Sequence, residues 1–204
     1  GDVAALTAKL SAWDAPTQTA VIAALGRSGD AGAVSAVVTA TRHTDAGIRA
    51  EALAALGFLP GNADIVTLLA QAAAANNADA KIARQSLARL NGPGVSAAVL
   101  AGAERADAKL RPIFIEALAL RHMTEAFPFL LKSRSESDPG IRAAAIGALG
   151  ELAPASEQNA ILDWAAAATD DTEQTKALRA LVNVTLRNPS VADRGRPVYA
   201  VIES

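Results

Sequence analysis

The segment Asp45-Ala-Gly-Ile-Arg-Ala-Glu-Ala-Leu-Ala-Ala-Leu-Gly57 recurs as Asp138-Pro-Gly-Ile-Arg-Ala-Ala-Ala-Ile-Gly-Ala-Leu-Gly150. The two segments agree at the leading Asp, at the Gly, Ile and Arg that follow, and at the closing Leu-Gly. Four weaker copies in the same frame begin at Asp14, Asp79, Asp107 and Asp170. This series has the period of a helical repeat protein, roughly 30 residues, and predicts a row of similar units that are each stabilised by their neighbours.

Each copy has the pattern of an α-helix with one buried face. Apolar residues stand eight and eleven residues after the Asp, and in most copies three residues after it, and these offsets share one helical face. The Asp is expected to accept hydrogen bonds from the first free backbone N–H groups as an N-cap. Gly26, Gly57 and Gly150 are expected to end their helices in the left-handed conformation. The residues at offset eleven are Leu25, Leu56, Leu90, Leu118, Leu149 and Leu181.

A second apolar series runs between these segments at one constant spacing. It predicts a second set of helices, here called A, that alternate with the B helices that follow each Asp. The last B helix is expected around Asp171 to Leu186. The chain is therefore predicted to be all-α, an α-solenoid of six helix pairs over residues 1–187. The pairs that define the series are Val37-Val38, Leu68-Leu69, Val99-Leu100, Leu130-Leu131 and Ile161-Leu162.

A tail at residues 188–204 leaves the repeat. It contains Arg194-Gly-Arg196-Pro197, which is typical of a loop, and then the apolar segment 198–202. The last helix of a solenoid exposes an apolar face, so we expect this segment to cover it as a flap. The alternative is a linker to a further domain.

The composition agrees with this architecture. Hydrophobic residues make up 51% of the chain but aromatic residues only 3%, and about a quarter of the residues are Ala, which favours helices in close contact. There is no cysteine, no run long enough for a membrane span, and a net charge of −2 that disfavours a general phosphate-binding surface. The chain begins with Gly1-Asp2 rather than Met, which we interpret as a processed or truncated start. A cytoplasmic and an exported location are both compatible with the sequence.

The motif Asp-x-x-Ile-Arg-x-x-Ala-Leu/Ile-x-Ala-Leu-Gly resembles the short HEAT repeats of phycobilin-lyase-like and other bacterial scaffold proteins. The resemblance extends over residues 2–187, closest in the copies at Asp45 and Asp138. Signatures of tetratricopeptide and ankyrin repeats are absent. The resemblance implies that the B helices form a concave surface and that ion pairs link neighbouring repeats.

Motifs for chemistry are few. His43 and His122 stand near helix ends beside arginines, and the residues that follow them are not the Glu that the HEAT-repeat diiron hydroxylase requires. We interpret the histidines through the helix dipole and predict no metal site. The loop with Gly26, Gly29 and Gly32 lacks the strand and the Lys of a phosphate-binding loop. We therefore predict no cofactor and no catalytic residues, and a chain that is not an enzyme.

The fourth copy departs from the others through Pro112, Phe114 and Met123, with Phe127 and Phe129 close behind. These residues could form a specialised pocket. We favour instead a packing interpretation, in which prolines shift the helix starts and bulky side chains fill the resulting gaps.

Nine residues after each Asp, the B helices are expected to present mostly small residues to the concave face: Ala23, Ala54, Ala88 and Gly147. Glu116 and Arg179 occupy the same offset in the fourth and sixth copies. The sequence thus predicts a smooth groove whose charge lies toward the C-terminal half, with Glu116 and Arg179 as candidate partner-binding residues.

Arg49, Arg111 and Arg142 each follow the leading Asp by four residues. They are further candidates for partner binding, as a row that meets an anionic partner. The alternative, which we favour, is structural: each Asp caps its helix and the Arg pairs with it or with an acid of the adjacent repeat. On that view Asp138→Ala should lower stability more than Arg142→Ala.

Three functions are compatible with the sequence. The first is a non-catalytic module that binds a protein or peptide on the concave face. The second is an accessory or lyase-like subunit with a ligand in the groove, and the third, less favoured, is nucleic-acid binding, which requires a continuous basic stripe.

Overall fold

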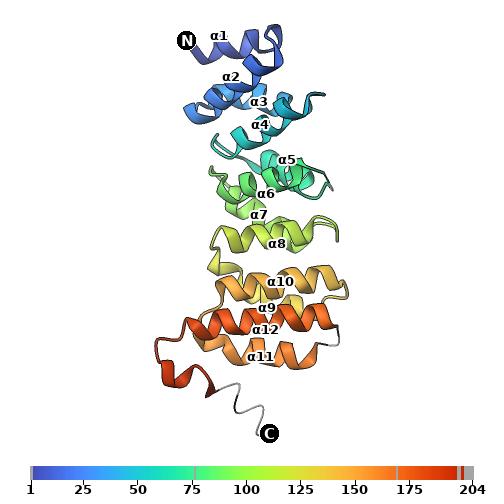
Figure 1. Ribbon diagram of the computed structural model, residues 1–204, viewed down its shortest axis with the longest axis vertical. Coiled ribbons are helices and arrows are strands. Elements are labelled where there is room, and N and C mark those ends of the chain that lie inside the picture. Colours follow the sequence, from blue (N-terminus) through green and yellow to red (C-terminus); the bar gives the residue numbers. More distant parts are fainter. Residues whose placement is uncertain (1, 76, 169, 197–198, 200–204) are drawn as a thin grey trace. The chain divides into compact units, whose positions relative to one another are not determined.

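The computed structural model describes residues 2–75, 77–168, 170–196 and 199, and most of these residues are helical (Figure 1). Within them there is no β-strand, only an isolated bridge between Pro60 and Asn91. The prediction of an all-α solenoid with six helix pairs is confirmed. The A helices are α1 (Asp2–Lys9), α3 (Val34–Ala40), α5 (Ala63–Ala73), α7 (Val95–Arg105), α9 (Phe127–Lys132) and α11 (Gln158–Ala167). The B helices are α2 (Ala15–Ser28), α4 (Ala46–Leu56), α6 (Asp79–Arg89), α8 (Arg111–Leu120), α10 (Pro139–Leu152) and α12 (Asp171–Leu186).

The chain divides into two compact units, an N-terminal unit of residues 1–102 and a C-terminal unit of residues 103–204. In the N-terminal unit α4 packs against α2 and α6, and α5 packs against α6. In the C-terminal unit α10 packs against α8 and α12, and α11 packs against α12. Each unit therefore buries its core between successive B helices and between A and B helices, as a repeat array requires.

The apolar pairs of the A helices mark their buried faces. The first member of the pair is 0% exposed in the second, fourth, fifth and sixth repeats, at Val37, Val99, Leu130 and Ile161. In the third repeat the second member, Leu69, is the one that is 0% exposed. The constant spacing arises because each A helix turns the same face toward the core of the array.

The glycines at the ends of the B segments have a different role from the one expected. Gly57 has φ −66, and Gly26 and Gly150 lie inside helices that continue to Ser28 and Leu152. A left-handed glycine occurs nearby only in the first of these three repeats, at Gly29 with φ 64. The expectation of left-handed ends at these glycines is wrong. The glycines are needed instead because the next B helix lies too close for a side chain.

Four of the six leading aspartates cap their helices as expected. The side chains of Asp14, Asp45, Asp138 and Asp170 each accept a bond from the backbone N–H three residues later, at 2.9–3.1 Å. Asp107 accepts bonds from the backbone of Lys109 and Leu110, one turn ahead of α8. These bonds satisfy N–H groups that would otherwise lack a partner in the first turn.

Asp79 is the exception, and its assignment as a repeat start is wrong. It lies at the first position of α6, is 6% exposed, and accepts a bond from Arg49 rather than from its own helix. The buried residues of α6 include Ala83, Ser86 and Leu87, which fit offsets seven, ten and eleven from position 76. Position 76 lies outside the described residues, but a repeat start there is equally distant from the starts at Asp45 and Asp107.

The packing interpretation of the fourth repeat agrees with the structure. Pro112 lies in the first turn of α8, where a missing N–H costs nothing. Pro128 has the same place in α9. Phe114 and Met123 are 4% and 5% exposed, so they fill the interior of the C-terminal unit rather than line a pocket.

The described part of the tail leaves one face of the last helix exposed. Arg194 in the tail donates from Nε to the carbonyl of Asn188, and its own carbonyl accepts a bond from Gln158. Meanwhile Leu178, Val182 and Leu186 of α12 are 49%, 56% and 59% exposed. Residues 188–196 therefore do not cover this apolar face. The flap expected at 198–202 lies outside the described residues except for residue 199.

Candidate functional site

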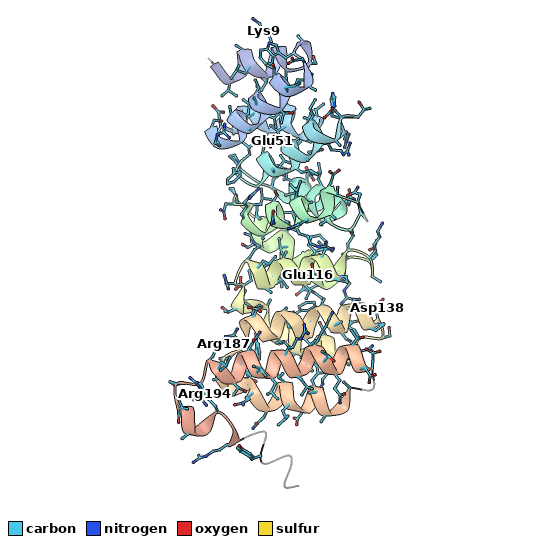
Figure 2. All side chains as sticks on the ribbon, in the orientation of Figure 1. Lys9, Glu51, Glu116, Asp138, Arg187 and Arg194 are labelled. Atoms are coloured by element: carbon cyan, nitrogen blue, oxygen red, sulfur yellow. The ribbon has the colours of Figure 1, made fainter. Side chains whose placement is uncertain are left out.

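The B helices of the C-terminal unit form a groove of about 470 Å³, here called the B-helix groove. Glu116 lines it from α8, Gly147 from α10 and Arg179 from α12. The sequence placed these three residues at the same offset, and the structure brings them to the same surface because α8, α10 and α12 pack side by side. Figure 2 marks Glu116 on α8. The groove is completed by Ala119, Leu120, Ala143, Ala144, Ala148, Gly150, Glu151, Lys176, Ala180 and Asn183.

Small side chains form the floor of the B-helix groove. Ala148 and Ala180 are each 3% exposed, whereas Gly147 is exposed and a Cβ added there would meet nothing within 4 Å. The floor is therefore smooth, with room above Gly147. It offers an apolar strip to any segment that docks between α8 and α12.

The rim of the B-helix groove carries both charge signs. Glu116 and Glu151 lie on α8 and α10, and the cations come from α12 as Lys176 and Arg179. None of the residues that line the groove is Ser, Thr, Cys or His. The arrangement suits binding through apolar and ionic contacts, and it lacks the side chains that most often serve as nucleophiles.

The corrected start of the third repeat changes one of the residues predicted at offset nine on the B helices. Counted from position 76, offset nine falls on Gln85, which is exposed, and not on Ala88. Ala23 and Ala54 are half-buried at the same offset. The prediction of a small residue in the third repeat was wrong because Asp79 had been taken as the repeat start.

Arg49 and Arg142 make the same set of bonds in two different repeats. Each donates from Nε to an acid of the following B helix, Arg49 to Asp79 at 2.7 Å and Arg142 to Glu173 at 3.0 Å. Each also donates from Nη1 to two backbone carbonyls of the loop before its own helix. An arginine can satisfy several acceptors at once because its donors are held in a planar fork.

Arg111 differs because the next B helix has Ile141 where an acid would be required. It donates instead from Nη2 to Glu136 at 2.7 Å and from Nε to the carbonyl of Ala103 at 3.1 Å. None of the three arginines lines the B-helix groove. Their ion pairs join neighbouring segments, and the leading aspartates serve as caps rather than as partners of their own arginines.

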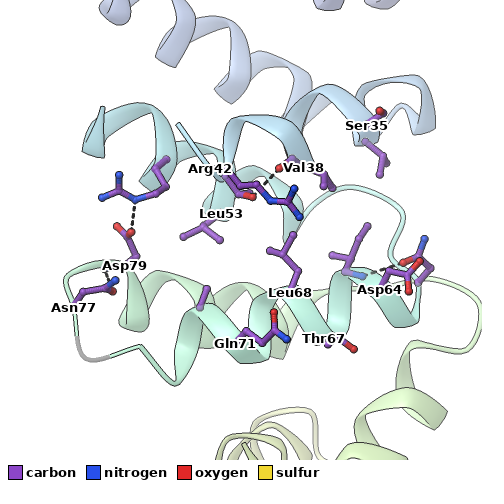
Figure 3. Close-up of a pocket in the computed structure, with 16 residues that line it drawn as sticks. Ser35, Val38, Arg42, Leu53, Asp64, Thr67, Leu68, Gln71, Asn77 and Asp79 are labelled. Carbon is purple, nitrogen blue, oxygen red and sulfur yellow. Dashed lines mark hydrogen bonds and ion pairs between the residues drawn. The ribbon is translucent and has the colours of Figure 1, made fainter. Parts of the chain in front are cut away.

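One groove in the N-terminal unit was not predicted. It measures about 670 Å³, lies between α3 and α5, and is here called the A-helix groove (Figure 3). Leu53, Ile65 and Leu68 form its apolar wall, Gln71 lies on its α5 side, and the Arg49–Asp79 pair lies at one end. The available sequence signal was Val34 and Gln71 at positions where Phe127 and Trp164 stand three repeats later, and only a repeat-by-repeat comparison reveals it.

A second set of arginines also escaped prediction. Arg187 donates to the carbonyls of Gly150 at 2.7 Å and Ala153 at 2.9 Å, at the C-terminal end of α10. Figure 2 shows Arg187 and the cap Asp138 at opposite ends of that helix. In the N-terminal unit Arg89 donates to the carbonyl of Ala54 at 3.0 Å. Arg187 thus satisfies carbonyls that α10 leaves free, whereas the Ala54 carbonyl that Arg89 contacts also accepts a bond from the backbone N–H of Gly57.

Burial of Arg89 lowers the pKa of its guanidinium from the usual value. The ring of Phe58, 4.1 Å from the guanidinium carbon, stabilises the cation through its π-electrons. The guanidinium remains charged at neutral pH because the ordinary pKa of arginine lies far above neutrality.

Among the described residues there is no group of three or more His, Cys, Asp or Glu side chains that could hold a metal ion. His43 uses Nδ1 to accept a bond from the backbone N–H of Asp45, so it belongs to the loop that precedes α4. In the part of the chain that the structure describes, no helix is long and apolar enough to cross a membrane.

Comparison with protein families agrees with the repeat architecture. The family model for HEAT repeats matches residues 3–88 and 96–182. A solved structure, the complex of CpcE and CpcF of phycocyanin lyase from Nostoc sp. PCC7120, is similar at a TM-score of 0.42 and 20% identity, over 97% of this chain and 92% of that chain. A search of curated proteins finds no match. With family matches over most of its length, the chain belongs to the HEAT repeat family.

Proposed function

We propose that this HEAT-repeat scaffold is a non-catalytic module that binds a protein or peptide segment in the B-helix groove. The observation that carries the proposal is the arrangement of Glu116 and Arg179 on either side of the small-residue floor of α10. A flat apolar strip between two charged edges favours a polypeptide, which brings apolar side chains and polar groups together.

The charges of the groove favour a partner segment of mixed charge. Lys176 and Arg179 on α12 attract a carboxylate of the partner, and Glu116 and Glu151 attract a cation. The same carboxylates repel a phosphate backbone, so this groove supports a peptide partner rather than a nucleic acid. Arg49, Arg111 and Arg142 lie outside the groove, and their contact with a partner stays a prediction.

The proposal is tested by peptide selection. A displayed library of random peptides is selected on the wild-type chain, and the enriched peptides are measured against three variants. Arg179→Glu reverses the sign of a charge on the α12 side of the groove. Gly147→Leu places a side chain in the groove at a position where a Cβ has open space. Lys81→Glu, on the exposed part of α6, is the matched control.

We expect at least tenfold weaker binding to Arg179→Glu and Gly147→Leu, and unchanged binding to Lys81→Glu. Peptides that retain their affinity for both groove variants would contradict the proposal. Thermal denaturation of each variant checks that a loss of binding does not come from a loss of fold.

A further inference from the structure

The A-helix groove has a smaller counterpart in the C-terminal unit, a pocket of about 440 Å³ that is lined by Arg142, Trp164 and Glu173. The ion pair Arg49–Asp79 at the end of the groove corresponds to Arg142–Glu173. At Arg142–Glu173 an aromatic side chain occupies the adjoining space: Trp164 of α11 is 1% exposed and donates from Nε1 to Glu173 at 2.7 Å. The two ion pairs thus have different surroundings although the arginines make the same bonds.

The repeat register identifies what the A-helix groove lacks. Three repeats separate α3 from α9 and α5 from α11, and the constant spacing of the A helices aligns their residues one by one. In this alignment Gln71 stands in the place of Trp164, and Val34 stands in the place of Phe127. Both Gln71 and Val34 line the A-helix groove. The groove is therefore open where the equivalent positions of the C-terminal unit carry two aromatic side chains.

The acceptor for an indole N–H is already in place. Glu173 uses both carboxylate oxygens, Oε2 for Arg142 and Oε1 for Trp164. Asp79 accepts Arg49 at Oδ2, while its Oδ1 accepts none of the hydrogen bonds found among the described residues. The Asp79 side chain is 9% exposed and lines the groove. Its Oδ1 is not among the buried atoms that lack a partner, so it is accessible to a donor that enters the groove.

We propose that the A-helix groove binds a tryptophan side chain of a partner polypeptide, with the indole N–H donated to Asp79 Oδ1. The ring lies against Leu53 and Leu68, which Figure 3 shows between α3 and α5. An indole supplies a large apolar surface and one donor, the two features that this groove can satisfy together. The site is separate from the B-helix groove and extends beyond the function proposed above.

The dimensions of the groove favour a polypeptide over a free indole compound. A volume of about 670 Å³ exceeds one indole ring and leaves room for flanking residues of the partner. Polar side chains, Ser35, Asp64 and Thr67, lie at the end away from Asp79, where they can bond to a partner backbone.

The first experiment uses the peptide Ac-Gly-Trp-Gly-NH2 as the probe and amide NMR of the full chain as the readout. We expect shifts concentrated in α3, α5 and the first turn of α6. The peptide with 1-methyltryptophan, which lacks the N–H, should bind at least threefold more weakly. The alanine peptide should produce no shifts.

Two outcomes would overturn the proposal. Shifts that fall elsewhere, or equal affinity for the methylated peptide, would show that Asp79 does not select the indole. Binding of free indole without binding of the tripeptide would assign the groove to a small molecule and not to a polypeptide.

The second experiment fills the groove from within. Gln71→Trp introduces the residue found at the equivalent position of the C-terminal unit, and its indole N–H should exchange slowly with solvent, as we also expect for Trp164. We expect this variant to lose binding of the tripeptide at least tenfold. Gln85→Trp, at an exposed Gln on α6, is the control and should retain binding. Unchanged binding by Gln71→Trp, with the variant folded, would place the peptide elsewhere.

Discussion

Gly150 of α10 lies directly against Ala180 of α12, so that a Cβ on the glycine would stand 2.9 Å from the alanine Cα and 3.0 Å from its Cβ. The same contact recurs in the N-terminal unit, where a Cβ on Gly26 would stand 2.7 Å from the Cβ of Ala55. Neighbouring B helices therefore approach one another at a pair of small residues. This explains why glycine is used inside helices, where it otherwise costs stability.

Gly150→Ala should lower the free energy of unfolding by about 1–3 kcal/mol, because the added methyl group forces α10 and α12 apart. Gly147→Ala, three residues earlier in the same helix, should raise it by about 0.5–1 kcal/mol, since the Cβ there meets nothing and alanine favours helix. Urea denaturation of both variants checks the contrast. Equal effects at the two positions would show that the close contact does not limit packing.

Arg142→Ala should cost more stability than Asp138→Ala, the reverse of the order expected from sequence. Removal of the arginine leaves the Glu173 carboxylate, whose side chain is 8% exposed, without its cation. It also leaves two loop carbonyls without a donor. We expect a loss of about 2–3 kcal/mol against about 1 kcal/mol for the cap. Thermal denaturation of both variants at neutral pH tests the order, and a larger effect of Asp138→Ala would contradict it.

Trp164→Phe should reduce stability by about 1–2 kcal/mol, because the phenyl ring retains most of the apolar contact but supplies no donor. Oε1 of the buried Glu173 is then left without the indole N–H. Trp13→Phe is the control, because the hydrogen bond found at Trp13 is donated by Gln18 to its backbone carbonyl and does not involve the indole. Chemical denaturation followed by circular dichroism compares the two variants. A similar loss in both would mean that the indole–carboxylate bond contributes nothing of its own.

The cap of α2 should weaken in acid. The hydrogen bonds donated by Thr17 hold the pKa of Asp14 below its ordinary value of 3.8. A carboxylate with a lowered pKa in the folded state contributes stability that is present at neutral pH and is lost as pH falls through that lower pKa. The difference in melting temperature between wild type and Asp14→Ala should therefore shrink below about pH 4. With Asp14→Asn, which retains an acceptor, this acid dependence should disappear; a difference independent of pH would refute the assignment.

The sequence predicted the helix pairs well because the same spacing of buried apolar residues recurs in every repeat. The spacing of Val37, Leu130 and Ile161 reports the buried face of the A helices, and a face that is buried in every repeat leaves a consistent pattern. The last B helix was expected around Asp171 to Leu186, and α12 has those bounds.

What could not be predicted depends on neighbours rather than on local pattern. Asp79 is the same residue type as the capping aspartates, and only the position of Arg49 distinguishes a cap from an ion-pair partner. Gly150 fits a left-handed helix end as well as a close contact, and the choice is made by α12. The A-helix groove has Gln71 where the equivalent position of the C-terminal unit has Trp164. The absence of an aromatic ring leaves no motif in a sequence.

The bonds of Arg187 have a consequence for how this array can be divided. They satisfy the C-terminal carbonyls of α10 from a residue that follows α12. A cut after α10 would therefore expose polar groups that the upstream helix cannot satisfy by itself. The interchangeable module is not the helix pair but the pair together with the arginine that follows the next B helix. Shuffling or truncation at the pair boundary should yield frayed ends, whereas exchange of segments that include this arginine should preserve cooperative unfolding.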